Sequence, residues 1–538
     1  MKVKNFFYYV LFIILFTGFF ITAPSTGDAK KKYVPEKILY IPHDNRPIVN
    51  QQTVELIEKV GYEVVMPPPE LLGNRDNLGK PDKLWDWLEK TAKDKQIKAA
   101  VLSSDSLLYG SLIGSRKHYY GKQLILERAE LFKEFCKKNK KLPVYVFGSI
   151  MRTPRAAENS GYQEPDYYRH YGANIFRYTA LVDKQELAGL TEREQKEIVF
   201  LKKLIPEKAL DDWMSRRGKN FDANKKLIDM ARERTFSSLF LGRDDNAPYS
   251  QTHLEGRNLQ HYGNSIGQRQ YLTMAGIDEM GLLTLTRAVN DLTKSAPTVY
   301  VHYNTGVGGN TIPSYSDEKV DVTINSELTA TGAKRVNDAS RADFILAVNT
   351  NPNGQTYEAP DYFNDGRERE GTRNFFNTVR NYVESGKNVA IADIAFANGS
   401  DNALMNSLSN SDLLFKIHAY AGWNTPTNST GFVIGSGILA NQMKLSDKRQ
   451  LLLMRYLDDW AYQANVRAVV ANQLSSFRGE GFYGALNDKR YSAEEQCSRL
   501  IQNFAAQKMQ TVKFAETPRV DFPWNRMFES NITFKVQH

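Results

Sequence analysis

Two neighbouring aspartates, Asp244 and Asp245, follow an apolar run at Leu239–Leu241 and stand directly before the residues NAP. Adjacent side chains of an extended strand point to opposite faces, so both carboxylates can serve one site only where the strand ends. In some glycosidases that act on 2-acetamido sugars, one carboxylate of such a pair orients the acetamido group as internal nucleophile and the other is the general acid. The pair therefore predicts glycoside hydrolysis, with a polar turn that caps a helix as the alternative.

Polar side chains also follow most of the other predicted strands. Trp423 offers a flat apolar face for a sugar ring, and Asn424 and Asn428 can hydrogen-bond sugar hydroxyls. Because the carboxyl ends of parallel strands carry the site in α/β proteins, we expect these residues to face one mouth. The candidate substrate-binding residues are Asp44, Arg46, Asp105, Arg152, Asn304, Asp393, Asn398, Trp423, Asn424 and Asn428.

A second role for the same carboxylates is to bind a divalent metal ion, with Asp44, Asp105 or Asp393 as further oxygen ligands. We assign no residue as a metal ligand and expect no cofactor, and a divalent metal ion is the one alternative that stays open. The sequence contains no Walker loop, no GxGxxG after a strand, no GxSxG and no HExxH. A serine-hydrolase triad is therefore not supported.

Short runs rich in Val, Ile and Leu alternate with amphipathic segments from Glu36 onward, which is typical of an α/β protein with a parallel sheet. The predicted strands are Ile38–Pro42, Glu63–Met66, Ala99–Ser103, Val144–Phe147, Leu239–Leu241, Thr298–His302, Phe344–Val348, Val389–Ala392 and Phe415–Ala419. The predicted helices between them include Gln51–Val60, Lys83–Lys95, Lys122–Lys138 and Thr372–Glu384.

Polar motifs at nearly every strand end favour a parallel (β/α)8-barrel-like core, since a barrel gathers all its strand ends around one mouth. Two Rossmann-like α/β lobes that face a cleft are the alternative. Residues 36–443 form the predicted α/β catalytic domain, which a helical insertion interrupts at 153–237. Residues 444–538 form a helical C-terminal region with a short strand at Ile532–Val536.

The N-terminus predicts export. Lys2 and Lys4 precede an apolar run from Phe6 to Ala23, and small residues follow it up to Ala29. This arrangement is typical of a signal peptide at residues 1–29, with an uncleaved membrane anchor as the alternative. The protein is therefore expected to be secreted or to lie in the cell envelope or periplasm. Its formal charge of +9 over 538 residues is mild, so no nucleic-acid partner is expected.

Several motifs occur together in one order: HDNRP, GRDDNAPYSQTHLE, GIDEMGLL, AFANGSDNAL, YAGWNTPTNSTG and DDWAYQANVR. In this set the chain resembles the bacterial domain-of-unknown-function family 4127 over nearly all of its mature length. It departs from that family's pattern at HDNRP, where a DDRP- or DSRP-like motif is expected. The resemblance implies no activity.

We therefore expect an exported glycoside hydrolase-like enzyme that acts on a polysaccharide or an N-acetylhexosamine-containing glycan. Asp245 is the expected general acid and Asp244 the group that orients the acetamido substituent, while Asn424 and Arg46 bind the sugar. The expected partner is a carbohydrate, and the membrane is a partner only through an uncleaved N-terminal segment. A non-catalytic carbohydrate-binding or envelope protein, or a metal-dependent hydrolase, are the alternatives.

Overall fold

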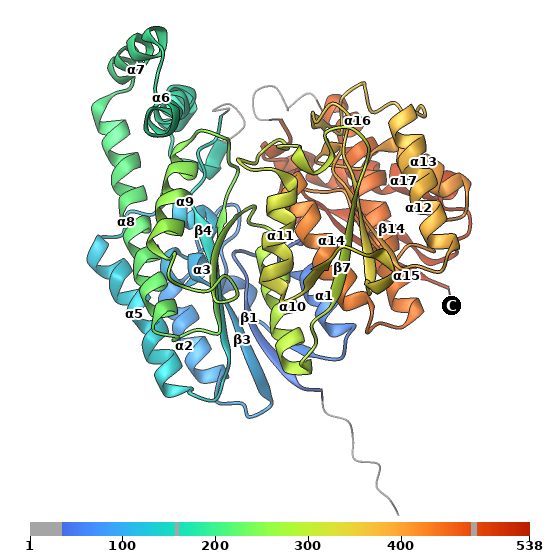
Figure 1. The fold of residues 1–538 in the computed structure, drawn as a ribbon, viewed down its shortest axis with the longest axis horizontal. Helices are drawn as coiled ribbons and strands as arrows, with labels where there is room; N and C mark the ends of the chain where they lie inside the picture. Colours follow the sequence, from blue (N-terminus) through green and yellow to red (C-terminus); the bar gives the residue numbers. More distant parts are fainter. Residues whose placement is uncertain (1–34, 156–160, 475–480, 538) are drawn as a thin grey trace, which may run out of the picture. The chain divides into compact units, whose positions relative to one another are not determined.

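Two parallel sheets dominate the fold (Figure 1). The first has six strands in the order β2-β1-β3-β4-β5-β6: β1 (Lys37–Ile41), β2 (Glu63–Val65), β3 (Ile97–Ser103), β4 (Val144–Ile150), β5 (Ser238–Arg243) and β6 (Tyr271–Ala275). The second has five strands in the order β13-β11-β9-β7-β8: β7 (Thr298–Tyr303), β8 (Lys334–Val336), β9 (Phe344–Asn349), β11 (Val389–Asp393) and β13 (Ala419–Ala421). The predicted α/β class with parallel strands is confirmed.

The two sheets share one strand order. In each, the second strand along the chain lies outside the first, and the third lies on the first strand's other side. This order places a switch point between β1 and β3 and another between β7 and β9, where open α/β sheets bind ligands at the carboxyl ends of their strands. The closure of eight strands into a barrel is not part of these pairings and stays a prediction.

The computed structural model describes residues 35–155, 161–474 and 481–537. All of these except Pro35 belong to the unit Glu36–His538. The predicted signal peptide lies outside the described residues. Within them, no helix combines the length and apolar character needed to cross a membrane.

Strand β1 shows how the sequence pattern builds layers on both faces of a sheet. Ile38 and Tyr40 point into a core between the two sheets, whereas Leu39 and Ile41 point into a separate core on the far side. This follows from the two-residue period of a strand, in which alternate side chains lie on opposite faces. Alternate residues of β1 therefore pack against the helix layers on opposite faces of the sheet.

Helices α10 (Met280–Thr293) and α14 (Pro426–Ala440) lie between the sheets and pack on each other (Figure 1). Helix α10 contacts β3 and β4, and α14 contacts β9, β11 and β13. All 15 residues of α14 are buried, as expected for a helix that is apolar on every side. Helices α1 (Gln51–Glu58) and α11 (Val320–Thr331) complete this layer.

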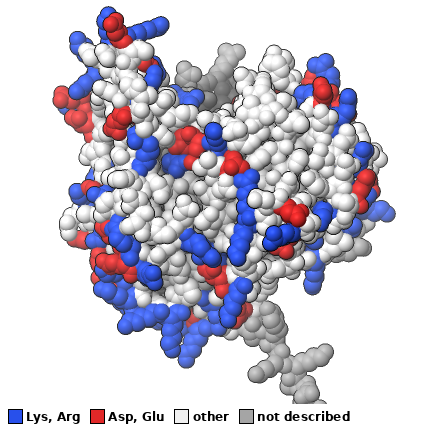
Figure 2. Space-filling model, viewed as in Figure 1, with Lys and Arg blue, Asp and Glu red and all other residues white. Residues whose placement is uncertain are grey.

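The far face of the first sheet is covered by α2 (Pro81–Thr91), α3 (Ser104–Tyr109), α5 (Lys122–Lys138), α8 (Glu207–Arg232) and α9 (Gln251–Tyr262). Helix α4 (Leu112–Lys117) follows α3. Helices α6 (Tyr168–Ala188) and α7 (Glu192–Leu204) precede α8, so residues 168–232 are mostly helical. Lysine and arginine side chains gather at the lower end of the face in Figure 2, where α2 and α5 end.

The far face of the second sheet carries the C-terminal elements and two crossover helices. They are α12 (Glu370–Glu384), α13 (Asn402–Asn410), α15 (Leu445–Arg455), the π-helix η5 (Tyr456–Val466), α16 (Arg467–Gln473) and α17 (Arg490–Lys508). Strands β14 (Phe514–Asp521) and β15 (Asn531–Val536) form an antiparallel pair, and β10 (Tyr357–Glu358) pairs in parallel with β12 (Phe396–Ala397).

Candidate active site

Two adjoining cavities lie where the strand ends of the first sheet face loops of the second. The outer cavity has a volume of about 870 Å³, and the inner chamber beneath it has a volume of about 50 Å³. Both are lined by Arg152, Asp245, Tyr315, Asn398, Tyr483 and Phe528.

The first sheet supplies the charged wall of the inner chamber. Arg46 follows β1, Arg152 follows β4, and Asp278 follows β6. Asp244 and Asp245 come directly after β5, which ends at Arg243, so the pair does end the fifth strand. The chain therefore turns at the pair, and both residues line the chamber.

The second sheet and the C-terminal region supply the opposite wall. Asn398 follows β12, Asn424 follows β13, and Asn428 lies in the first turn of α14. Tyr483, Arg526 and Phe528 come from the C-terminal region. Segments nearly 500 residues apart in the chain, from Arg46 to Phe528, thus meet around one small polar space.

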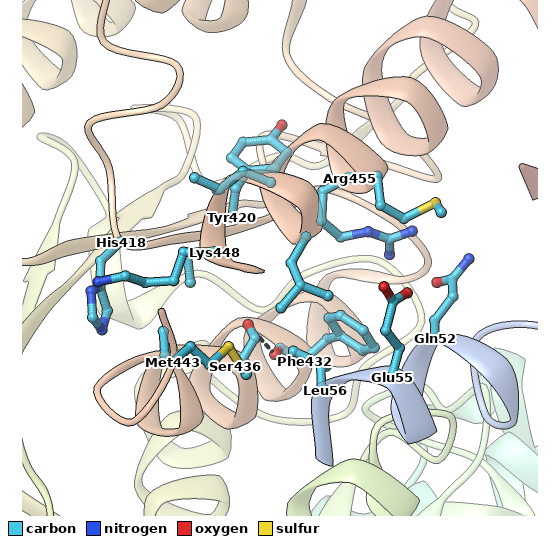
Figure 3. Close-up of a pocket in the computed structure, with 15 residues that line it drawn as sticks. Gln52, Glu55, Leu56, His418, Tyr420, Phe432, Ser436, Met443, Lys448 and Arg455 are labelled. Carbon is cyan, nitrogen blue, oxygen red and sulfur yellow. Dashed lines mark hydrogen bonds between the residues drawn. The ribbon is translucent and has the colours of Figure 1, made fainter. Parts of the chain in front are cut away.

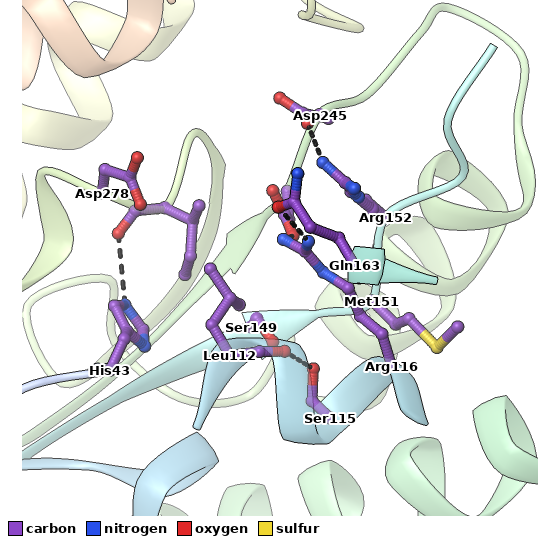
Figure 4. Close-up of polar contacts among 12 residues, drawn as sticks. His43, Leu112, Ser115, Arg116, Ser149, Met151, Arg152, Gln163, Asp245 and Asp278 are labelled. Atoms are coloured by element: carbon purple, nitrogen blue, oxygen red, sulfur yellow. Dashed lines mark hydrogen bonds and ion pairs between the residues drawn. The ribbon is translucent and has the colours of Figure 1, made fainter. Parts of the chain in front are cut away.

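Each aspartate of the pair accepts a hydrogen bond from its own arginine. Arg152 Nη1 lies 2.8 Å from Asp245 Oδ2 (Figure 4). Arg116 Nη2 lies 2.5 Å from Asp244 Oδ2. The Asp244 side chain is 4% exposed, whereas that of Asp245 is 31% exposed. Asp245 is therefore the more accessible carboxyl of the pair and faces both cavities, whereas Asp244 faces the inner chamber alone.

The pKa of Asp245 is raised. Burial is the main cause and the neighbouring Asp244 charge adds to it, while Arg152 and Arg116 offset part of the effect. Burial, with a smaller contribution from the like charge of Asp244, thus raises the pKa of this carboxyl of the pair. A raised pKa suits a group that donates a proton near neutral pH.

Three residues that line both cavities have left-handed backbone conformations. The φ angles are 31° at Asp245, 65° at Tyr315 and 61° at Asn398. Non-glycine residues adopt this region at a cost of about 1 kcal/mol or more, and such positions cluster at functional sites. Hydrogen bonds hold the backbone here: Asn246 N donates to Tyr315 O over 3.0 Å, and Asn398 N donates to Asn424 O over 2.7 Å.

A hydrogen-bonded series crosses the floor of the chamber from one sheet to the other. Arg46 donates through Nε to Asp44 and through both Nη atoms to Asp278, over 2.6 Å and 2.9 Å. Asn424 Nδ2 donates to Asp278 Oδ2 over 3.0 Å. Burial is the largest single effect on Asp278 and raises its pKa, but the charge and hydrogen bonds of Arg46, with the hydrogen bond from Asn424, together outweigh burial, and the net pKa is lowered.

Two buried amide oxygens in the chamber have no hydrogen-bond partner within the described part of the chain. They are Asn424 Oδ1 and Asn398 Oδ1, whose side-chain nitrogens already donate to Asp278 and Glu358. Since buried polar atoms are normally paired, these two acceptors point to a ligand that brings N–H or O–H donors. Gln163 Nε2, on the side of the chamber that carries Arg116, is unpartnered among the described residues as well.

Seven of the predicted site residues line the inner chamber: Arg46, Arg152, Asp244, Asp245, Asn398, Asn424 and Asn428. The expectation that Asp44, Asp105, Asn304, Asp393 and Trp423 share this space is wrong, since none of them lines either cavity. The physical reason is that each of these side chains is buried and already contacts or hydrogen-bonds neighbouring residues of the protein.

Asp44 is 1% exposed and accepts from Arg46, and Asp105 accepts from Ser149 Oγ over 2.7 Å and lies 3.1 Å from His43 Nδ1. Asn304 bonds to Asn349 and to the Thr350 carbonyl. These side chains hold the loops that follow their strands. They therefore position the site from below.

Asp393 and Trp423 belong to the interior of the second half. Asp393 accepts from Asn349 Nδ2 and Tyr420 Oη, and burial together with the Asp401 charge raises its pKa to about 7. The Trp423 ring is 2% exposed and packs 5.7 Å from the ring of Phe528. Trp423 thus supports Phe528, which itself lines both cavities.

Sequence reasoning missed several chamber residues: Arg116, Gln163, Asp278, Tyr315, Tyr483, Arg526 and Phe528. Asp278 was within reach of sequence reasoning, because it follows the run YLTMA, which forms β6. Arg116 lies on the short helix α4, and Tyr483 and Phe528 lie in the C-terminal region. No strand-end pattern identifies those positions.

Among the described residues, no group of three or more His, Cys, Asp or Glu side chains is placed to hold a metal ion. Asp44, Asp105 and Asp393, the proposed additional oxygen ligands, do not line the chamber.

A third cavity, of about 30 Å³, lies apart from the predicted residues, between α1, β13, α14 and α15 (Figure 3). Its walls are mostly apolar, with Leu56, Phe432 and Met443 among them, and Glu55 and Arg455 stand at one end. None of the predicted site residues lines it.

Comparison with known proteins gives a family and no activity. A family model described as "Protein of unknown function (DUF4127)" matches residues 38–533. No curated protein matches the chain, and no solved structure matches it.

Proposed function

The chain belongs to this DUF4127 family, and from that premise we propose, on the chemistry of the site, that it is a glycoside hydrolase-like enzyme. The substrate would be a polysaccharide or an N-acetylhexosamine-containing glycan. One observation carries the proposal: the Asp245 carboxyl has a raised pKa, is reachable from a cavity of about 870 Å³, and is adjacent to a second carboxylate.

In the proposed reaction Asp245 gives its proton to the leaving glycosidic oxygen. The acetamido carbonyl oxygen of the substrate attacks the anomeric carbon as the bond to the leaving oxygen breaks. Asp244, which Arg116 holds in place, accepts a hydrogen bond from the acetamido N–H and stabilises the positive charge that develops on that group. Water then opens the cyclic intermediate, and Asp245 takes the proton back.

The hydrogen-bonding character of the chamber supports a neutral, donor-rich ligand. The chamber arginines Arg46, Arg116, Arg152 and Arg526 are each paired with a carboxylate of the protein. The unpartnered groups include the acceptor oxygens of Asn398 and Asn424. Sugar hydroxyls and an acetamido N–H would supply the donors that these oxygens lack.

The cavity walls also suit a sugar. Tyr315, Tyr483 and Phe528 line both cavities, and Phe482 and Tyr357 line the outer one. Aromatic faces with a few placed polar groups are typical of ligand cavities. The proposed setting is outside the cytoplasm, on the strength of the signal-like segment at residues 1–29.

The test is the Asp245→Asn variant. We expect turnover of the cleaved glycan to fall by at least about 100-fold, the usual contribution of a general acid, with an unchanged melting temperature. Asp86→Asn, at an exposed position of α2 outside both cavities, is the matched control and keeps full activity. If the purified protein releases nothing from a broad glycan panel while a metal-dependent phosphoesterase or amidase panel responds, the proposal is wrong.

A non-catalytic carbohydrate-binding protein is the second candidate. It is favoured by the ion pairs that neutralise Asp244, Asp245 and Asp278. Binding without turnover that survives Asp245→Asn and is lost in Tyr483→Ala would support it. Activity that disappears with a chelator and returns with Mg²⁺ would instead support the metal-dependent hydrolase.

A further inference from the structure

Aromatic side chains extend from the wall of the outer cavity to the surface. Tyr357 lines that cavity, and its ring lies 5.3 Å from the ring of Phe363, which in turn lies 3.9 Å from the ring of Tyr362. Tyr362 is 81% exposed and Phe363 is 49% exposed. These three rings, here called the aromatic strip, thus run from the cavity into solvent.

The backbone that carries the strip is held by specific hydrogen bonds. Tyr357 is in β10 and is paired in register with Phe396 of β12, whose ring lies 6.2 Å away. Asn364, directly after Phe363, donates to the carbonyls of Ala359 and Ser400 and accepts from Asn402 N over 2.8 Å. The exposed rings therefore stand on a fixed turn.

Tyr362 and Phe363 form a contiguous exposed aromatic surface, since their rings contact each other and Phe363 contacts Tyr357 of the cavity wall. Exposed apolar groups that adjoin a cavity mark binding surfaces more often than scattered ones do. Ile312 and Tyr315, which are 45% and 40% exposed, line the same cavity from the loop after β7. This loop lies beside β10, because Ser314 Oγ donates to Thr356 O and Tyr315 Oη donates to Glu358, so it extends the exposed apolar surface next to Tyr357.

We propose that the aromatic strip binds further sugar units of a glycan chain whose reacting unit lies at Asp245. The inference rests on the proposed function and names its substrate class: an extended polysaccharide of several units. The occupant follows from continuity, because the strip begins at the cavity wall with Tyr357. Ring faces without charged partners suit the apolar faces of sugar rings.

The experiment measures binding of two N-acetylglucosamine oligosaccharides, of two and six units, by calorimetry. The full chain carries Asp245→Asn so that neither probe is consumed. We expect the six-unit probe to bind at least tenfold more tightly than the two-unit probe. The double variant Tyr362→Ala/Phe363→Ala should lose this difference while its affinity for the two-unit probe changes less than twofold.

Tyr491→Ala is the matched control, since this tyrosine is 77% exposed and lines neither cavity. The proposal that the aromatic strip binds glycan would be overturned by equal affinities for the two probes, by an unchanged difference in the double variant, or by no binding of either probe. A change from dimer to monomer in the double variant, seen by sedimentation, would assign the strip to contact between copies and overturn it too. Turnover of the two-unit probe by the unmodified chain tests the proposed hydrolase separately, because the strip plays no part in it.

Discussion

At the scale of single residues, the carboxyl group next to Asp278 has a different environment from Asp278 itself. Glu279 is 1% exposed and lies against Gly431 of α14, and neither of its carboxyl oxygens has a partner in the described part of the chain. Burial, with a smaller contribution from the Asp278 charge, raises the pKa of Glu279 to about 8. Burial and the Glu279 charge also raise the pKa of Glu327, on α11.

The raised pKa predicts that stability falls as pH rises. Between the ordinary value of 4.5 and about 8, the unfolded chain releases the Glu279 proton while the folded protein keeps it. The loss is at most about 1.4 kcal/mol per pH unit and on the order of a few kcal/mol in all. Glu279→Gln, which stays neutral, should therefore lose less stability between pH 5 and pH 8.5 than the unmodified protein in urea titrations.

Glu192→Gln makes the same change in net charge at an exposed position of α7 and is the control. Its pH dependence should follow that of the unmodified protein. Parallel stability curves for Glu279→Gln and the unmodified protein would contradict the prediction.

Residue type and strand-end position together identified the Asp244–Asp245 turn, Arg46, Arg152 and three asparagines. The same rule failed for Asp105 and Asp393, because position after a strand does not say whether a neighbour already occupies the side chain. Asp105 accepts a hydrogen bond from Ser149 and lies beside His43, and Asp393 accepts hydrogen bonds from Tyr420 and Asn349. These partners come from other strands or from the loop after β1, so only the assembled sheet reveals them.

At the scale of elements, α14 shows how a small residue sets a helix contact. A Cβ atom on Gly431 would lie 2.4 Å from Glu279 Cγ, and one on Gly435 would lie 2.8 Å from Leu282 Cγ. The two glycines therefore let α14 approach α10 closely. Since α14 also carries Asn428 and follows Asn424, this contact sets one wall of the inner chamber.

Gly431→Ala should therefore destabilise the protein although alanine favours helices. Overpacking in a filled core costs about 1–3 kcal/mol, which exceeds the gain of about 1 kcal/mol from helix propensity. Gly218→Ala in α8 is the matched control, because its new Cβ meets nothing within 4 Å. It should gain up to about 1 kcal/mol. Thermal unfolding of the two variants side by side measures both, and a stabilised Gly431→Ala would refute the contact.

Local patterns predicted most elements, and the misses have identifiable causes. The helix Lys122–Lys138 was predicted with the bounds of α5, and the runs at Ile38–Pro42 and Phe344–Val348 match β1 and β9 closely. The expected strand Phe415–Ala419 is wrong, since β13 is Ala419–Ala421 and the apolar run before it is a turn. Strand β8 (KRV) has no apolar alternation because it is an edge strand.

At the scale of the whole unit Glu36–His538, one hydrophobic cluster joins both sheets. It includes Tyr40 of β1, Leu282 of α10, Ile434 of α14 and Leu346 of β9. A shared core of this kind predicts a single unfolding transition for the two halves. The strand order that divides the chain into two sheets could not be read from local patterns, because pairing between distant strands leaves no local signal.

Leu282→Ala tests the shared core. Loss of this fully buried side chain should cost about 2–5 kcal/mol, and β3 and β9 should lose protection from hydrogen exchange at the same, lower urea concentration. Leu187→Ala, at a residue that is 48% exposed, is the control and should have little effect. Protection that persists in β9 after β3 has exchanged would show that the halves unfold independently.

The buried layer of α10 and α14 also limits how the molecule can move. Two-lobed proteins commonly close on a ligand by rotation about a hinge, which requires an interface that can slide or part. Here the two sheets and the helices between them share one core of side chains that are almost wholly inaccessible to solvent. We therefore expect the spacing between the sheets to be the same in the free and glycan-bound states, so that the arrival and departure of the glycan depend on rim loops alone.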